Sequence, residues 1–142
     1  MRDLTTKFGS GAGKIWKALN ETGSLKEEEL KEKTQLNTDD FYGGIGWLAR
    51  ENKIAKHDEE NLRLGATNLT SKIGDDAGRV WKILDIWGEV DIHSIKRLAD
   101  IQEEDAHTAL GWLAKEDKIC VDKYLRFSLK SVSYTHLRAH ET

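Results

Sequence analysis

The chain has 142 residues, with 22 Lys and Arg against 25 Asp and Glu and a formal net charge of −3. This balance disfavours a protein that binds nucleic acid through bulk positive charge, because phosphate contacts need an excess of Lys and Arg. There is no signal peptide and no apolar run long enough to span a bilayer, which predicts a cytoplasmic protein without a membrane partner. The single cysteine, Cys120, excludes an internal disulfide and is expected to be buried in a strand.

An internal repeat dominates the sequence. Residues 3–54 align without a gap onto residues 68–119, and 19 of the 52 paired positions are identical. This tandem duplication predicts a first domain at 1–65, a linker at 66–67 and a second domain at 68–130. A linker this short predicts a packed pseudo-dimer, and chemistry intrinsic to the repeated unit should appear in both copies.

The first predicted element of each copy is an amphipathic helix. Asp3 and Asn68 are expected to cap it, and Gly23 and Gly88 are expected to end it before a short extended segment. Its apolar positions in copy one share one helical face; they are Phe8, Ala12, Ile15, Trp16 and Leu19.

Two further helices and a hairpin follow in each copy. The second helix is predicted over 27–35 and 93–100, and the third begins after the polar runs 37–40 and 102–105. Alternating segments predict strands at 53–56 and 61–64 in copy one, and at 118–121 and 124–127 in copy two. The fold class is therefore α+β, mainly α: two tandem winged helix-turn-helix domains, each with three helices and a short β-hairpin wing.

Two motifs recur in both copies. The third helix ends in Gly46-Trp47-Leu48-Ala49-Arg50-Glu51-Asn52-Lys53-Ile54 and its counterpart at 111–119, and the first helix carries Ala12-Gly13-Lys14-Ile15-Trp16 and its counterpart at 77–81. In these motifs the chain resembles a family of small prokaryotic winged helix-turn-helix proteins of uncharacterised function, normally with one domain per chain. The resemblance covers nearly all of both repeats and implies the fold more strongly than a function.

Residues 131–142 have no counterpart in copy one. They resemble translated sequencing-adapter read-through, so we interpret them as an artefactual tail outside both domains and give its histidines no functional weight.

No enzyme, cofactor or metal site is predicted. The run Gly9–Lys14 lacks the spacing and the preceding strand of a phosphate loop, and copy two places Asp75 and Asp76 there. His57, His93 and His107 do not recur between copies, and no sequence spacing joins them to further ligands.

Four tryptophans recur and are expected to be structural, packing in the core or anchoring a partner; they are Trp16, Trp47, Trp81 and Trp112. Trp16 and Trp81 are expected at equivalent positions and largely buried. Trp87 has no counterpart and is expected either to seal the contact between the copies or to mark a partner surface. A joint formed by Trp87 or by the wing strands is the expected arrangement.

Acidic residues stand where the third helix of a DNA-reading domain carries Arg, Lys, Asn or Gln. Asp39 and Asp40 occupy these positions in copy one, and residues 103–105 are all acidic in copy two. The candidate contacts with nucleic acid or a partner are therefore basic residues of the wings, although such charges are usually only solvated; they are Lys53, Lys56, Arg63, Lys118, Lys123 and Arg126.

Two functions remain open. The fold favours a DNA-associated transcriptional regulator without catalytic activity, whereas the charge favours a protein–protein interaction module that uses the acidic third helix or a wing. In the first case DNA is bound weakly through the wings, and in the second the partner is another protein.

Overall fold

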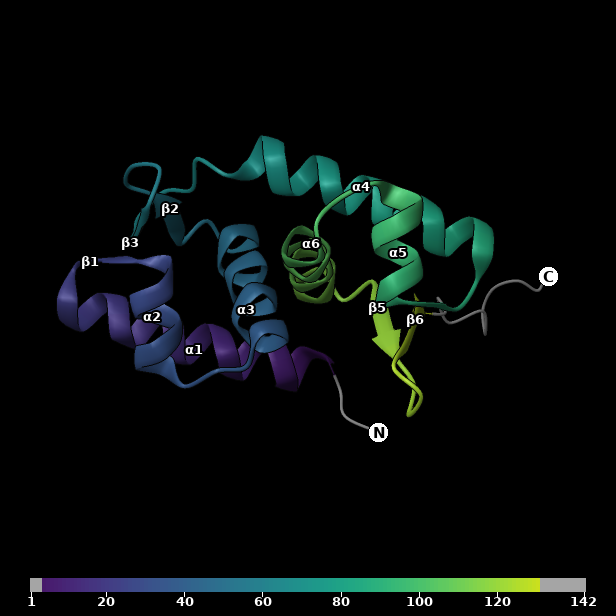
Figure 1. Ribbon diagram of the computed structural model, residues 1–142, viewed down its shortest axis with the longest axis horizontal. Helices are drawn as coiled ribbons and strands as arrows, with labels where there is room; N and C mark the ends of the chain where they lie inside the picture. The colour runs from purple at the N-terminus through teal and green to yellow at the C-terminus, as the bar shows by residue number, and fades with distance from the viewer. Residues whose placement is uncertain (1–3, 131–142) are drawn as a thin grey trace.

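The computed structural model describes residues 4–130, which form six helices and two three-stranded sheets (Figure 1). Copy one contains α1 (Leu4–Thr22), β1 (Ser24–Lys26), α2 (Glu27–Thr34), α3 (Thr38–Arg50), β2 (Ile54–Lys56) and β3 (Asn61–Leu64). Copy two contains α4 (Thr70–Trp87), β4 (Val90–Asp91), α5 (Ile92–Ala99), α6 (Glu103–Lys115), β5 (Ile119–Val121) and β6 (Arg126–Leu129).

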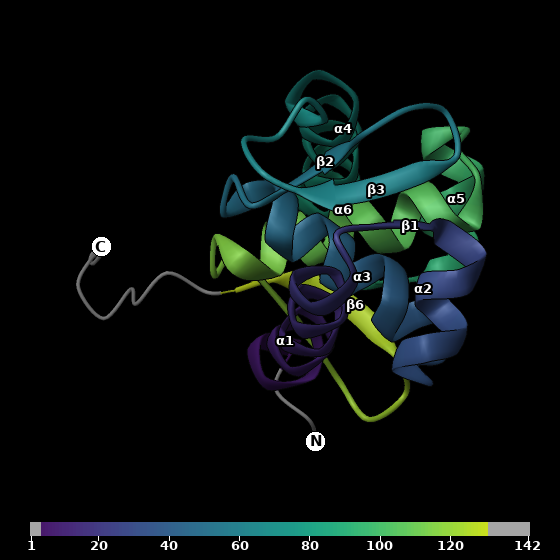
Figure 2. The ribbon, with the colours of Figure 1, turned by 90° about the vertical axis from the view of Figure 1, so that its left-hand side faces the viewer.

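Each sheet places the last strand of its copy in the centre. The strand orders are β1-β3-β2 and β4-β6-β5, and every pairing is antiparallel. The three strands of the first sheet lie side by side in Figure 2. The short strand after the first helix thus ties the hairpin to the helical part of its own copy, in the predicted winged order.

Polar side chains define the starts of the later helices. Asn37 accepts a hydrogen bond from the backbone N–H of Asp40 at 2.8 Å, and Asp91 accepts one from Ser94 at 2.8 Å. The first-helix cap predicted at Asn68 is wrong, because Leu69 holds the N-cap position of α4. Asn68 instead accepts from the backbone N–H of Lys56 and donates to its carbonyl oxygen, both at 2.9 Å, so it fastens the linker to β2.

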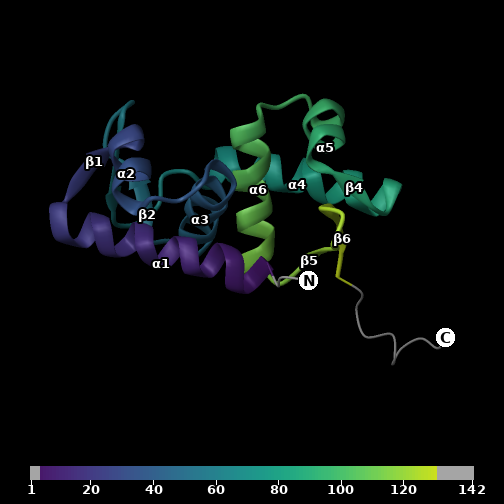
Figure 3. The ribbon, with the colours of Figure 1, turned by 60° about the horizontal axis from the view of Figure 1, so that its bottom comes forward.

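The two hydrophobic cores exchange residues across the repeat. Leu4 and Phe8 at the start of α1 belong to the core of copy two, whereas Ile73 near the start of α4 belongs to the core of copy one. Figure 3 shows why: α1 crosses α3 and begins beside α6. Because each domain needs apolar side chains from the other to complete its core, the two copies pack as one unit.

Two predictions about single side chains are wrong. Trp16 and Trp81, expected to be largely buried, are 41% and 37% exposed, because they lie at the edge of the α1 and α4 faces. Cys120 does lie in a strand, but its side chain faces solvent beside Ser128. The last strand also starts two residues later than predicted, because Tyr124 and Leu125 form the hairpin turn.

Candidate functional site

The joint between the two copies is the pair of third helices, which lie side by side in the middle of the molecule (Figure 1). Their backbones meet at glycine: a Cβ atom added to Gly46 would lie 1.8 Å from the carbonyl oxygen of Thr108. One added to Gly111 would lie 1.8 Å from the carbonyl oxygen of Gly43. Residues 46 and 111 are equivalent in the repeat, as are 43 and 108, so the contact has pseudo-twofold symmetry.

Charged and aromatic side chains repeat this symmetry at the far end of the two helices. Arg50 lies over the ring of Trp112 at 5.7 Å and its Nε is 2.9 Å from Glu116. Lys115 lies over Trp47 at 5.3 Å and its Nζ is 3.7 Å from Glu51. Such partly exposed contacts contribute little individually, but four of them in matched positions fix the register of the pair.

Both flanks of α3 are therefore occupied. A Cβ on Gly44 would meet Ile15 and Ala12 of α1, whereas Gly46 meets α6. Trp47 and Trp112 are partly buried and pack against both cores. The joint predicted at Trp87 is wrong, because Trp87 is 62% exposed and small residues of α3 and α6 make the main contact. The alternative prediction of the wing strands holds in part, since β5 and β6 supply Val121 and Phe127 to the apolar cluster that Leu4 and Phe8 of α1 join.

The first turns of α3 and α6 remain accessible and acidic. Lys7 pairs with Asp40, and the equivalent Lys72 lies 3.5 Å from Asp105 and 2.5 Å from Asp76. The hydrogen bond to Asp76 raises the pKa of Lys72, so this lysine stays protonated at neutral pH. Asp39, Glu103 and Glu104 are exposed beside these pairs, which leaves the helix starts with an excess of negative charge.

The six predicted wing residues do not form one patch. Wing one (residues 54–64) and wing two (residues 119–129) lie toward opposite ends of the molecule (Figure 1). Lys53 is 3.7 Å from Glu51 and Lys118 is 3.4 Å from Glu116, so both face carboxylates of their own copy. Arg63 turns back to donate to the carbonyl oxygen of Leu64.

At wing two, Asp122 organises the basic side chains. It lies 2.9 Å from Arg126 Nη2 and accepts from the backbone N–H groups of Tyr124 and Arg126, which together hold the pKa of its carboxyl below the usual value. Lys123 and Arg126 each lie 5.2 Å from the centre of the Tyr124 ring. The tip therefore exposes an aromatic ring with two cations near it, and Leu125 next to it in the chain is also exposed.

Copy two also exposes apolar side chains at the end of α4. Ile86 is 73% exposed and lies next to Trp87. The equivalent residues of copy one are Glu21 and Thr22, so this apolar pair is specific to copy two. In the sequence Trp87 is distinctive because copy one has no tryptophan at the equivalent position, and Ile86 is distinctive because its equivalent is the charged Glu21.

Comparison with known proteins agrees with the repeat. The family model described as winged helix-turn-helix domain (DUF2582) matches twice, over residues 1–64 and 69–127. No curated protein and no solved structure shows a detectable match to the chain. Among the described residues, no helix is long and apolar enough to cross a membrane. The chain belongs to the DUF2582 winged helix-turn-helix family and carries that domain twice.

Proposed function

We propose that this protein is a cytoplasmic protein–protein interaction module without catalytic activity, built as a covalently linked winged-helix pseudo-dimer. The observation that carries the proposal is the backbone contact of Gly46 and Gly111 with the opposite third helix. A helix held this closely by a partner helix leaves its acidic first turn as the accessible part, and carboxylates there are repelled by the phosphate walls of a major groove. The third helix serves as a pairing element.

Charge supports the same conclusion. The accessible starts of α3 and α6 are acidic, and several wing cations are already paired with carboxylates. Nonspecific DNA affinity comes mainly from cations that release counterions from phosphates. A chain of net charge −3 with its wings apart offers few such contacts.

The partner surface we propose is the end of α4, where Ile86 and Trp87 project into solvent. Exposed tryptophans are typical anchors of protein interfaces, because they bury a large apolar area at low entropic cost. Copy one supplies an internal reference at Glu21 and Thr22, where the same helix end is polar.

A photo-crosslinking amino acid placed at position 87, and separately at position 22, tests this in cells. We expect a discrete protein adduct from position 87 that the Ile86→Glu substitution removes, and none from position 22. Equal labelling at both positions, or no adduct at position 87, would contradict the proposed surface.

A DNA-associated regulator is the second candidate, and the tip of wing two favours it. Lys123, Tyr124 and Arg126 offer cations and a stacking ring to a phosphate backbone or groove. Titration of random duplex DNA at two salt concentrations separates the candidates. Submicromolar binding at physiological salt, weakened by Lys123→Ala and Lys56→Ala with a flatter salt slope, would establish the regulator and displace the interaction module.

A further inference from the structure

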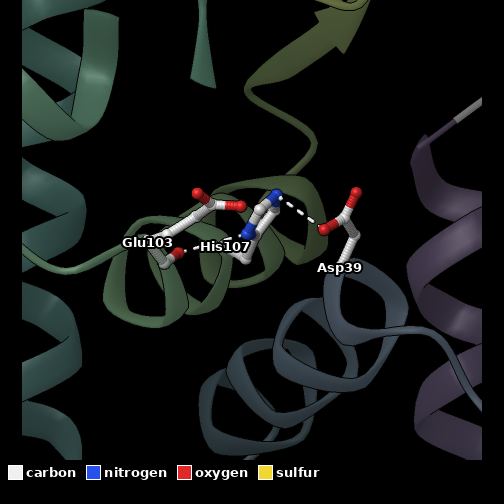
Figure 4. Close-up of side chains that lie close together, drawn as sticks. All are labelled: Asp39, Glu103 and His107. Carbon is white, nitrogen blue, oxygen red and sulfur yellow. Dashed lines mark hydrogen bonds and ion pairs between the residues drawn. The ribbon is translucent and has the colours of Figure 1, made fainter. Parts of the chain in front are cut away.

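Three potential metal ligands meet where α3 and α6 begin (Figure 4). Glu103 and His107 lie one turn apart on α6, and Asp39 reaches them from the first turn of α3. One ligand atom from each residue lies within 4.8 Å of the others. The histidine is only 3% exposed, whereas both carboxylates are exposed, so an ion has access from solvent.

The hydrogen bond of His107 fixes which ring nitrogen faces the carboxylates. Nδ1 lies 3.1 Å from the backbone carbonyl oxygen of Glu103, which can only accept, so Nδ1 carries the proton and donates it. In the neutral ring Nε2 then presents a lone pair, and its neighbour at 3.3 Å is Oδ1 of Asp39. Two acceptors at this distance are held together by a cation shared between them, either a proton or a metal ion. A ring held by an Nδ1–H to carbonyl bond is also the usual arrangement of a metal-binding histidine.

We infer that Asp39, Glu103 and His107 bind one divalent transition-metal ion, with Zn²⁺ as the best match. One imidazole and two carboxylates suit zinc and neutralise its charge. Two ligands about 2.0 Å from a tetrahedral zinc ion stand about 3.3 Å apart, which is the separation of Nε2 and Oδ1. A cavity of about 70 Å³, lined mainly by apolar side chains, adjoins Asp39 and His107 but not the solvent-exposed Glu103, so a fourth ligand comes from solvent water on the open side.

The site occurs on only one side of the pseudo-twofold axis. The residues equivalent to Glu103, His107 and Asp39 are Thr38, Tyr42 and Glu104. There the Tyr42 hydroxyl donates to Glu27 at 2.5 Å. Burial is the main cause, and this hydrogen bond the second, of a Tyr42 pKa well above the usual value. Because Asp39 belongs to α3 and the other two ligands to α6, the ion bridges the two copies and stabilises their joint. This inference does not depend on which partner the protein binds.

Calorimetric titration of ZnCl₂ into the EDTA-treated full-length chain tests the site. The background carries His136→Gln and His140→Gln, so that the two histidines of the C-terminal tail cannot bind the ion. We expect one ion per chain and a melting temperature raised by several degrees in excess zinc. The absence of both effects would show that His107 and Asp39 form only a proton-bound pair and would overturn the inference.

Matched variants locate the ion. Asp39→Asn and Glu103→Gln alter exposed side chains and keep their size, so they carry the test even if His107→Gln fails to fold. Each should weaken zinc binding at least tenfold and abolish the thermal shift. Glu104→Gln, across the pseudo-twofold axis, and His93→Gln, an exposed histidine, should leave both readouts unchanged. Zinc binding that Asp39→Asn leaves intact would place the ion elsewhere and refute the site.

Discussion

Substituting Gly46 with alanine should break the joint between the copies. The new Cβ would lie 1.8 Å from the carbonyl oxygen of Thr108, whereas ordinary contact starts at 3.4 Å, so the helices must separate by 1.6 Å. Because the opposing atom is backbone, no rotamer change relieves the clash, and a gap of this size forfeits most of the dispersion contact around it. We expect a loss of about 3 kcal/mol, the upper part of the range for overpacking.

Urea denaturation followed by tryptophan fluorescence measures this loss, and a thermal scan should show a fall of about 12 °C, at about 4 °C per kcal/mol. The matched control is Gly13→Ala in α1, where the new Cβ would meet no other side chain or element within 4 Å. It should raise stability by up to about 1 kcal/mol, because alanine is the better helix former. If Gly46→Ala proved as harmless as Gly13→Ala, the close contact of α3 and α6 would be refuted.

Three further predictions follow from burial, charge and the shared cores. Trp16→Ala should cost about 1–2 kcal/mol by urea denaturation, less than the 2–5 kcal/mol typical of a buried Leu→Ala change such as Leu19→Ala; an equal cost would mean that Trp16 is buried in solution. Asp122→Asn should lower the melting temperature at neutral pH but not near pH 2. The pKa of the Asp122 carboxyl is lowered in the folded state, so the carboxylate stabilises the fold above the unfolded-state pKa and loses this effect as the pH falls through the folded-state pKa. A difference in melting temperature that does not change with pH would contradict this. Fragments 1–67 and 68–130 should be largely unfolded by circular dichroism when separate and regain helix when mixed, because Phe8 and Ile73 complete each other's domains; independent folding of either fragment would count against shared cores.

The repeat and the periodic apolar positions were enough to predict the fold. They predicted the order of the helices and strands and the two hairpins. Local patterns succeed here because helix starts, glycine stops and alternating strands depend on neighbouring residues. Trp16 was misassigned for the same reason: periodicity places a residue on a helix face but does not show where the opposing layer ends.

The joint between the copies could not be predicted from the pattern of residues along the chain. Gly43 and Gly46 read as weak helix formers, and only the three-dimensional contact shows that their missing side chains let two backbones meet. The sequence does contain a sign of this contact: small residues spaced three apart recur in both third helices, as Gly43 and Gly46 in one and Thr108 and Gly111 in the other.

The proposed metal site was not predicted, because functional residues were required to recur in both copies. His107 fails that requirement because Tyr42 stands at the equivalent position. Asp39 lies far from His107 in sequence and meets it only because α3 packs on α6. A site at a pseudo-symmetric joint can be unique even when the fold around it is duplicated.

The thermodynamic coupling of Gly46→Ala with Gly111→Ala tests the central claim, that the third helices pair with each other, most directly. Free energies of unfolding of the native chain, both single variants and the double variant complete the cycle. The first alanine already separates the helices, so the second should cost at least about 1 kcal/mol less in its presence than alone. Additivity within about 0.5 kcal/mol would show that the two glycines act at independent sites, and it would contradict the pairing of α3 with α6.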